Sequence, residues 1–277
     1  MKKQSKPRAK INMGRLIKIV FVSGVVLLFL WLFGRAFIAD YFSINSSSMY
    51  PTIKPGNTIV VNKLIFGARI YKRFNFESEE LKSFRVKGVR KVKVNDIIVF
   101  NYPFDYELTR IRFEINYVYV KRVAGLPGDT LSIESGFYKN NNYPETIGDY
   151  DTQSLLSEIY RDSLMRWRNG HTFPYNEEIY NWNDLNFGPL YVPKRGAKVA
   201  LNQNSYILYK LIIEYETGEK FNIDNGRLYL GQNIISEYTF KNNYYFVAGD
   251  NVLNSFDSRR FGLIPEEYIV GVVGWIL

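Results

Sequence analysis

The chain has 277 residues, 46% of them hydrophobic and 17% aromatic, which predicts a folded protein with a sizeable core rather than a disordered one. Its net charge of +9 is concentrated in the first 18 residues, which hold seven Lys and Arg; the other 29 nearly balance 27 Asp and Glu, so the excess indicates a tail and no nucleic-acid partner. The absence of Cys excludes disulfides, thiolate catalysis and Cys-based metal sites, and it fits an exported domain.

A hydrophobic segment at residues 16–38 follows the basic tail at residues 1–15. Its 23 residues exceed the roughly 20 that a spanning helix needs. The Lys and Arg residues before it predict a cytoplasmic N-terminus and place residues 39–277 outside. A cleaved secretory signal is the alternative, because Gly34-Arg35-Ala36 loosely resembles a small-x-small cleavage site. The charge in that site and the length of the apolar run favour a retained anchor.

After the anchor, short runs rich in β-branched and aromatic residues alternate with turn sequences, which predicts a mainly β, antiparallel domain. The runs are residues 58–61, 96–100, 117–121, 205–208, 244–247 and 269–273, and the turns are residues 54–57, 126–129, 217–219 and 224–226. Residues 133–243 are more polar and rich in Asn and Tyr, with a predicted helix near residues 152–168 and further strands after Lys198. We interpret this stretch as an insertion or subdomain.

The chemistry can be narrowed by elimination. A Ser-His-Asp triad needs an imidazole, and the single His171 lies in a polar stretch that predicts a surface loop. A zinc site is disfavoured because, with one His and no Cys, carboxylates would have to supply most of its ligands. A lysine can replace histidine as the base if burial lowers its pKa from about 10.4 toward 7 or 8.

Lys121 meets that criterion. In a strand, Tyr117, Tyr119, Lys121 and Val123 share one face, so Lys121 is expected among aromatic and apolar side chains. The alternative is a lysine on the solvent face whose aliphatic stem covers neighbouring rings. A nearby nucleophile would decide between the two interpretations.

Ser48 is the candidate nucleophile, in a Ser-rich segment between the anchor and the first β run. Taken alone, this segment is equally well interpreted as a linker. Four ordered motifs, however, resemble the sequence boxes of bacterial type I signal peptidases: Ser46-x-Ser48-Met49-x-Pro51-Thr52, Asp96-Ile97-x-Val99-Phe100, Tyr119-x-Lys121-Arg122-x-x-Gly125-x-Pro127-Gly128-Asp129 and Gly249-Asp250-Asn251-x-x-Asn254-Ser255-x-Asp257-Ser258-Arg259. The resemblance covers about residues 16–132 and 244–277.

The resemblance implies an antiparallel β-barrel-like catalytic domain with an inserted subdomain, preceded by one transmembrane helix. It implies that Ser48 attacks the scissile carbonyl group and that neutral Lys121 takes its proton. The Ser46 hydroxyl and the Ser48 amide would form the oxyanion hole, and Ser255 would orient the Lys121 amine through a hydrogen bond.

Other positions in the motifs are expected to support the site. Charged residues would brace its loops, with surface ion pairs as the alternative interpretation: Arg122, Asp250, Asp257 and Arg259. Met49 and Ile53 would line the substrate cleft, although ordinary core packing explains them equally well.

The last motif departs from the family pattern. Val252 and Leu253 stand where the family usually has Arg and Asp, and the joint change indicates a deleted ion pair. It leaves open an inactive relative, but Ser46, Ser48, Lys121 and Ser255 all keep the side chains that the chemistry needs.

Placement near the membrane indicates the substrate. Ser48 lies ten residues beyond Ile38, which an extended chain spans in at most roughly 35 Å. Exported preproteins with a signal peptide and an Ala-x-Ala-like site would present a bond within that reach. The expected location is the bacterial cytoplasmic (inner) membrane, single-pass, with the catalytic domain on the periplasmic side. Preproteins, membrane phospholipid and the translocation machinery are the expected partners, and no cofactor or metal is expected.

The resemblance therefore predicts a membrane-anchored serine endopeptidase that removes signal peptides. Two alternatives remain: a Ser/Lys peptidase of narrow substrate range, and an inactive membrane-anchored β module that binds partners.

Overall fold

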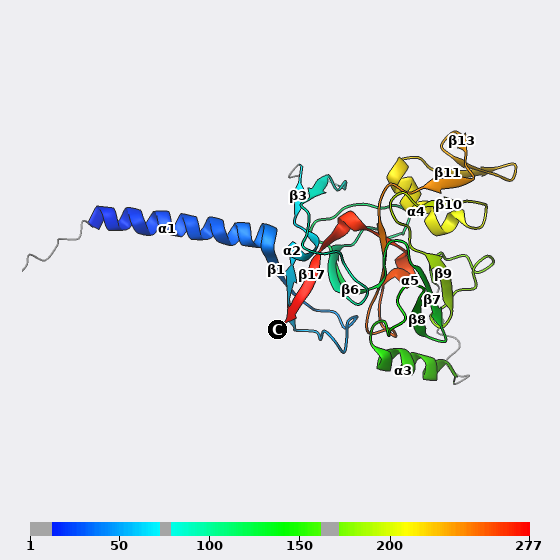
Figure 1. Cartoon of the computed structure of the whole chain (residues 1–277), viewed down its shortest axis with the longest axis horizontal. Helices are drawn as coiled ribbons and strands as arrows, with labels where there is room; N and C mark the ends of the chain where they lie inside the picture. The colour runs from blue at the N-terminus through cyan, green and yellow to red at the C-terminus, as the bar shows by residue number, and fades with distance from the viewer. Residues whose placement is uncertain (1–12, 73–78, 162–171) are drawn as a thin grey trace, which may run out of the picture.

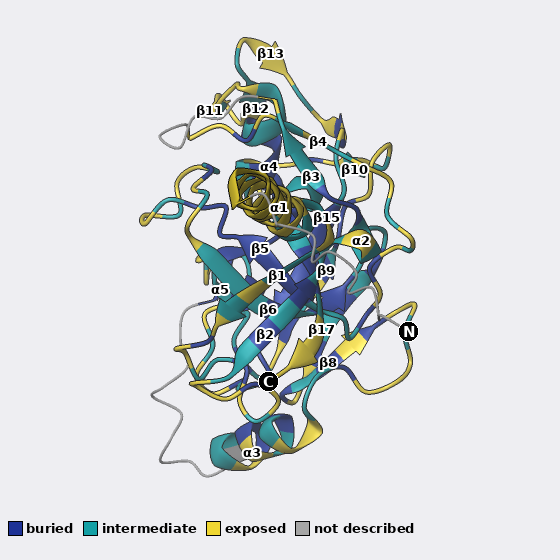
Figure 2. Ribbon diagram, turned by 90° about the vertical axis from the view of Figure 1, so that its left-hand side faces the viewer, coloured by how far each residue is buried: buried dark blue, intermediate teal, exposed yellow. Residues whose placement is uncertain are grey.

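A computed structural model describes residues 13–72, 79–161 and 172–277. Helix α1 (Met13–Phe33) continues through one π-helical turn, η1 (Gly34–Ile38), and projects away from the globular part of the protein (Figure 1). It is the one helix among the described residues that is long and apolar enough to cross a membrane, and none of its residues is buried. Figure 2 shows it end-on, exposed around its whole circumference. The predicted anchor is therefore a continuous helix, with most of the basic tail outside the described residues.

Charged side chains fix the point where the helix joins the domain. Arg35 donates two hydrogen bonds to Asp40, at 2.9 and 2.6 Å, and its guanidinium lies 4.7 Å from the centre of the Tyr41 ring. Lys63 donates to the Arg35 carbonyl oxygen at 2.7 Å. The end of the anchor is thus tied to the first strands by ionic contacts.

One curled antiparallel sheet of seven strands forms the centre of the globular part. Its strands, in sheet order, are β1 (Ala39–Ser43), β2 (Thr58–Asn62), β17 (Ile269–Ile276), β5 (Ile97–Asn101), β6 (Val118–Gly125), β15 (Tyr244–Ala248) and β16 (Ile264–Pro265). Five of the six predicted β runs lie in this sheet, which confirms the mainly β prediction. Its strands come from both ends of the chain.

The segment between β6 and β15 adds no strand to that sheet. Its strands form three smaller sheets: β7 (Thr130–Glu134) with β8 (Phe137–Asn140) and β9 (Phe187–Tyr191), β10 (Lys198–Ala200) with β14 (Glu237–Thr239), and β11 (Phe221–Asp224) with β12 (Arg227–Leu230) and β13 (Asn233–Ile234). Its helices are α3 (Tyr150–Arg161) and α4 (Tyr206–Thr217). We propose, as the sequence predicts, that residues 133–243 are an insertion. They share a core with the main sheet, in which Ile133 and Leu190 pack with Phe246 and Ala248.

The remaining short elements surround the sheet. They are α2 (Lys63–Phe66), a hairpin of β3 (Arg69–Tyr71) and β4 (Ser83–Arg85), α5 (Ser258–Phe261) and the 3₁₀ turn η3 (Glu266–Tyr268). The predicted turn at residues 54–57 is confirmed by a hydrogen bond from the Asn57 amide to the Lys54 carbonyl oxygen, and that at 224–226 joins β11 to β12. Residues 217–219 end α4, where Gly218 takes a positive φ of 75°.

In the insertion, the structure contradicts one sequence prediction and confirms part of another. The prediction of a strand at residues 205–208 is wrong, because these residues begin α4, whose buried Tyr209, Ile212 and Ile213 recur at helical spacing. A four-residue apolar run cannot distinguish a strand from a buried helix. The predicted helix near residues 152–168 is confirmed as α3 up to Arg161, whereas its predicted end and His171 lie outside the described residues.

Strand β6 separates two apolar clusters, as its alternating side chains predict. Val118 and Val120 pack against the cluster that contains Met49 and Ile53. Tyr119 and Val123 belong on the other side, with a cluster that contains Phe100, Tyr102 and Phe104. The two faces of this strand therefore meet different surroundings.

Candidate active site

Ser48 lies in a tight turn between β1 and β2 that buried side chains hold in place. The amide of Tyr50 donates to the Ser47 carbonyl oxygen at 3.0 Å. Met49 and Ile53, next to it in the turn, are 1% and 0% exposed. From the opposite side, the Asn251 amide donates to the Ser48 carbonyl oxygen at 3.1 Å. Side-chain burial and backbone hydrogen bonds thus fix the position of the serine hydroxyl.

Lys121 projects from β6 toward that hydroxyl. Its Nζ donates to Ser48 Oγ at 2.7 Å and to the Val120 carbonyl oxygen at 3.1 Å, and the residue is 4% exposed. Burial lowers the pKa of Lys121 to about 8; the Asp257 carboxylate opposes this shift, and Arg259 lowers the pKa further. The amine therefore loses its proton far more readily than an ordinary lysine, about half of the molecules being neutral at pH 8, and it lies within proton-transfer distance of a hydroxyl.

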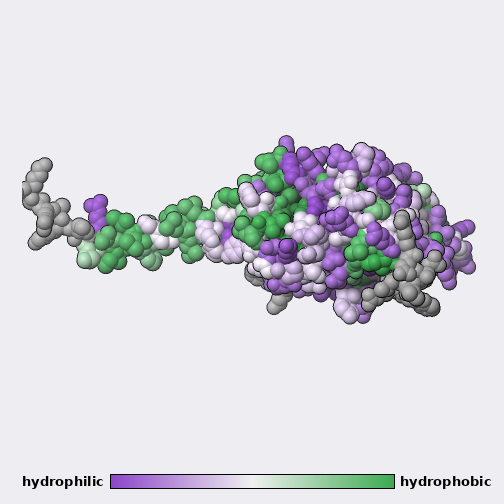
Figure 3. Space-filling model, turned by 90° about the horizontal axis from the view of Figure 1, so that it is seen from below, coloured by the Kyte–Doolittle hydropathy of each residue, from purple (hydrophilic) through white to green (hydrophobic). Residues whose placement is uncertain are grey.

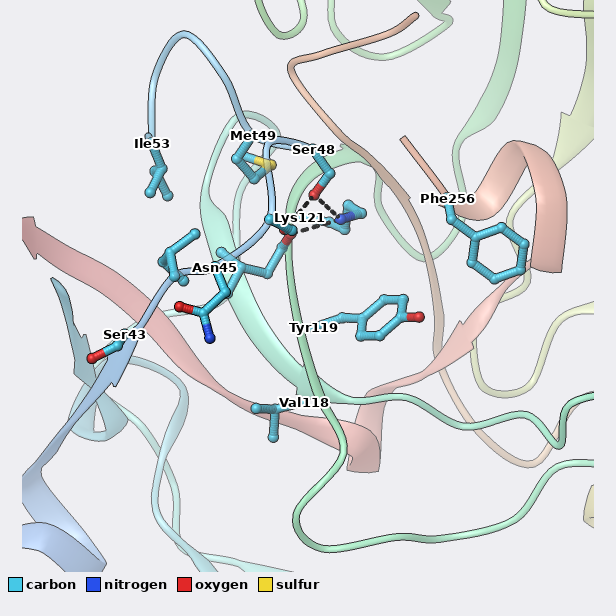
Figure 4. A pocket seen from close by; sticks show the side chains of 12 residues that line it. Ser43, Asn45, Ser48, Met49, Ile53, Val118, Tyr119, Lys121 and Phe256 are labelled. Atoms are coloured by element: carbon cyan, nitrogen blue, oxygen red, sulfur yellow. Dashed lines mark hydrogen bonds between the residues drawn. The ribbon is translucent and has the colours of Figure 1, made fainter. Parts of the chain in front are cut away.

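Ser46 lies beside this pair on the exposed side. Its Oγ is 3.3 Å from Ser48 Oγ (Figure 4). We propose, as the resemblance implies, that the Ser46 hydroxyl and the Ser48 backbone N–H receive the oxygen of a carbonyl group attacked by Ser48. Two such donors can stabilise a negative charge that develops on that oxygen.

Ser255 differs from what the resemblance implies. Its hydroxyl is buried and, among the described residues, makes no hydrogen bond to Lys121; it lies close enough to Asp257 to help lower the pKa of that carboxyl. The hydroxyl instead packs against the α-carbon of Gly249, close to the Ser48 carbonyl oxygen. The position of Gly249 thus sets that of Ser255.

Two bidentate ion pairs hold the chain around the site. Arg122 donates to the two carboxylate oxygens of Asp250 at 2.7 and 2.6 Å, and Arg259 donates to both oxygens of Asp257 at 2.9 Å. Asp250, Asp257 and Arg259 are at most 2% exposed, so these are buried pairs and the surface-pair interpretation is wrong. Burial alone raises the pKa of Asp257, but the Arg259 guanidinium outweighs it and holds that pKa below its ordinary value.

Asp184 extends this network from the insertion, although no sequence pattern predicted it. The residue is 6% exposed, and its carboxylate accepts from Arg259 Nη1 at 3.3 Å and from Arg260 Nη2 at 2.7 Å. It lies in a polar stretch without a motif, 75 residues before Arg259. Val252 stands where the resemblance implies an Arg. Its side chain is buried in the core, and its carbonyl oxygen accepts a hydrogen bond from Arg259 at 3.0 Å.

A cleft of about 370 Å³ opens beside Ser48 and Lys121. It is lined by residues of two segments and by one ring from the last motif: residues 43–46, 48, 49 and 53, residues 118–121, and Phe256. Met49 and Ile53 lie on one side of it in Figure 4, and the rings of Tyr119 and Phe256 on the other. Within the described ranges, no three His, Cys, Asp or Glu side chains come together as a possible metal site.

Comparison with known proteins gives a consistent result. The family model described as "Signal peptidase, peptidase S26" matches residues 15–277. A signal peptidase I of Buchnera aphidicola from Baizongia pistaciae is 28% identical over 249 residues, covering 87% of this chain and 70% of that protein. A signal peptidase I of Aquifex aeolicus is 26% identical, covering 87% and 76%. The crystal structure of a signal peptidase I from Enterococcus faecalis matches with a TM-score of 0.31 and 19% identity, covering 68% of this chain and all of that one.

Gly249→Ala tests the packing around the serine. An added Cβ would lie within 3 Å of both the Ser255 hydroxyl and the Ser48 carbonyl oxygen, so the turn must shift. We expect acylation of Ser48 by a serine-directed reagent to slow by on the order of 100-fold, because small displacements of reacting groups are costly. Gly274→Ala, whose Cβ would meet only ordinary contacts, is the control and should react at the wild-type rate. Equal rates in both variants would contradict this packing.

Asp184→Asn tests the link between the insertion and the site. Removing the charge leaves the buried Arg259 and the partly buried Arg260 with less negative charge beside them, so we expect a loss of about 3 kcal/mol in the free energy of unfolding, measured with denaturant. Glu237→Gln removes an acid whose pair with Lys198 is exposed, and it should cost less than about 1 kcal/mol. Similar losses in the two variants would argue against a structural role for Asp184.

Proposed function

The chain belongs to the signal peptidase family, peptidase S26, and on that basis we propose that it removes signal peptides from exported preproteins by means of Ser48 and Lys121. It is a membrane-anchored serine peptidase in this proposal. The observation that supports the assignment of the two residues is the buried Lys121 amine 2.7 Å from the Ser48 hydroxyl.

The proposed reaction begins when the neutral Lys121 amine takes the proton of the Ser48 hydroxyl as its oxygen attacks the scissile carbonyl carbon. The negative oxygen of the tetrahedral intermediate accepts hydrogen bonds from the Ser48 N–H and the Ser46 hydroxyl. When the C–N bond breaks, Lys121 returns the proton to the leaving amine, and an ester to Ser48 remains. The neutral Lys121 amine then takes a proton from a water molecule as the water oxygen attacks the ester carbonyl carbon. The bond between that carbon and Ser48 Oγ breaks, the peptide leaves with a new carboxyl group, and Lys121 returns the proton to Ser48 Oγ.

The edge of β6 offers a binding site for the substrate backbone. Val118 to Lys121 pair with β5 on one side, whereas β15 pairs only with residues 122–125 on the other. Among the described residues, the first half of β6 therefore has no strand beside it in front of the cleft. An extended peptide can add to such an edge through backbone hydrogen bonds, which would bring its carbonyl group to Ser48.

The apolar helix α1 supports a single-pass membrane location. Hydrophobic side chains follow this helix and continue onto the adjoining part of the globular body (Figure 3). We propose an N-terminus in the cytoplasm, from the basic residues before the helix, and a catalytic domain on the outer side of the inner membrane. The same proposal includes contact with the translocation machinery, because that machinery would deliver the precursor proteins to the outer side of the membrane.

The two other functions make different predictions. A narrow-range peptidase would cleave one precursor among many, whereas an inactive binding module would cleave none. The paired Arg122 and Asp250 and the buried Val252 favour an active enzyme, because the loop that carries Ser255 keeps its support without the family's Arg and Asp.

Replacing the two central residues tests the proposal. Ser48→Ala and Lys121→Met should each reduce cleavage of a panel of signal-bearing precursors by on the order of 10⁴-fold or more, as measured by mature-protein release in detergent. Ser132→Ala and the exposed Lys139→Met are matched controls with wild-type rates expected. Cleavage that survives in Ser48→Ala or Lys121→Met would contradict the mechanism.

The pH dependence tests the state of the amine. Because the pKa of Lys121 is lowered from 10.5 to about 8, the neutral, reactive form gains population as the pH rises through 8. We expect kcat/KM to rise up to that pH and then level off. A rate that keeps rising past pH 10 would mean an ordinary, solvated lysine.

A further inference from the structure

A second hollow adjoins the catalytic cleft and has no part in the proposed reaction. Its volume is about 610 Å³, and it shares Tyr119 and Phe256 with the cleft. Tyr102, Phe104 and Tyr117 line it as well. We call the hollow bounded by these five residues the aromatic pocket. Because two of its walls are also walls of the cleft, a peptide in the cleft can reach it without any movement of the chain.

The rings form a fixed floor and an open rim. Tyr102 and Phe104 are 5% and 2% exposed, and Tyr102 stacks on Tyr119 with ring centres 4.7 Å apart. Tyr117 and Phe256 are each 43% exposed at the rim. A side chain that entered would therefore cover aromatic surface that is otherwise in water, which favours an apolar occupant.

The charge around the pocket also favours a neutral occupant. Arg112 is the one basic residue among those that line it, and its guanidinium lies 3.3 Å from Glu114 and 3.7 Å from Glu79. No excess positive charge remains to hold a phosphate or a carboxylate.

The alternation of β6 identifies which substrate residue faces the pocket. A peptide added to the free edge of β6 continues the sheet, so its successive side chains point to opposite faces. One face meets Met49, Ile53 and Val120 in the catalytic cleft, and we place the two small side chains of the expected Ala-x-Ala sequence there. The other face carries Tyr119 and opens into the aromatic pocket.

We propose that the aromatic pocket binds a large apolar or aromatic side chain at the middle position of the small-x-small sequence before the cut. This inference rests on the proposed function and adds a specificity to it. Phe256, which follows Ser255 directly in the last motif, is the residue that joins the pocket to the catalytic cleft. Figure 4 shows the rings of Phe256 and Tyr119 on the same side of the catalytic cleft.

The test uses one precursor with Ala, Leu, Phe or Asp between two alanines at the cleavage site and the full-length wild-type enzyme in detergent. We expect the Leu and Phe precursors to be cleaved with kcat/KM about tenfold above the Ala precursor, and the Asp precursor to fall below it. In Phe256→Ala the ratio of Phe to Ala should fall below about threefold, because part of the binding surface is gone. Ile234→Ala, an exposed apolar residue on β13, is the control and should keep the wild-type ratio.

The outcomes separate the two proposals. Equal rates for the Ala, Leu and Phe precursors in the wild type would overturn this inference alone. A wild-type ratio in Phe256→Ala would also overturn it and assign the pocket to another occupant, such as a lipid acyl chain. Failure of the wild type to cleave any of the four precursors would overturn the proposed function and this inference with it.

Discussion

The removal of one lysine amine from water is the constraint on which the rest of the site depends. Lys121 is 4% exposed, and this burial brings its pKa down to about 8. An amine that loses its proton so readily can serve as a base for the Ser48 hydroxyl, 2.7 Å away. Apolar side chains such as Met49 and the ion pair of Asp257 with Arg259 surround the site and limit the access of water.

Buried ion pairs connect this amine to distant parts of the chain. The pair of Arg122 and Asp250 joins β6 to the last motif, and Arg259 lies between Asp257 and Asp184 of the insertion. Such pairs contribute little net stability, but they fix geometry because a change of partner leaves a charge buried. We propose that the loop tolerates Val252 and Leu253 in place of the Arg and Asp that the resemblance implies, since it keeps these other attachments. The insertion is part of the same structure, because it supplies one of the carboxylates.

The sequence was sufficient where a local pattern determines the structure. The β-branched runs of β2, β5, β6, β15 and β17, and the alternation that puts Lys121 with Tyr119, could be predicted from neighbouring residues alone. The helix at residues 205–208 could not be predicted from those four residues alone, because its helical spacing becomes visible only with Tyr209 and Ile213 farther along the chain. Asp184 and Phe256 were missed for another reason: their importance arises from contacts between segments far apart in the chain. The hydrogen bond from Ser255 to Lys121 is not formed among the described residues, and the position of the Ser255 hydroxyl next to Gly249 could not be predicted from the motif.

A direct titration of the Lys121 amine tests the central claim. The full-length protein in detergent micelles, labelled with ¹³C and ¹⁵N at lysine, can be followed by NMR over pH 6–11, with Lys121→Met identifying the signal. Most exposed lysines should titrate near their ordinary pKa of about 10.4. The account predicts that one signal, absent from Lys121→Met, titrates with a midpoint near 8. A midpoint for that signal at or above the ordinary value would show that the amine stays charged, and the proposed mechanism would then be wrong.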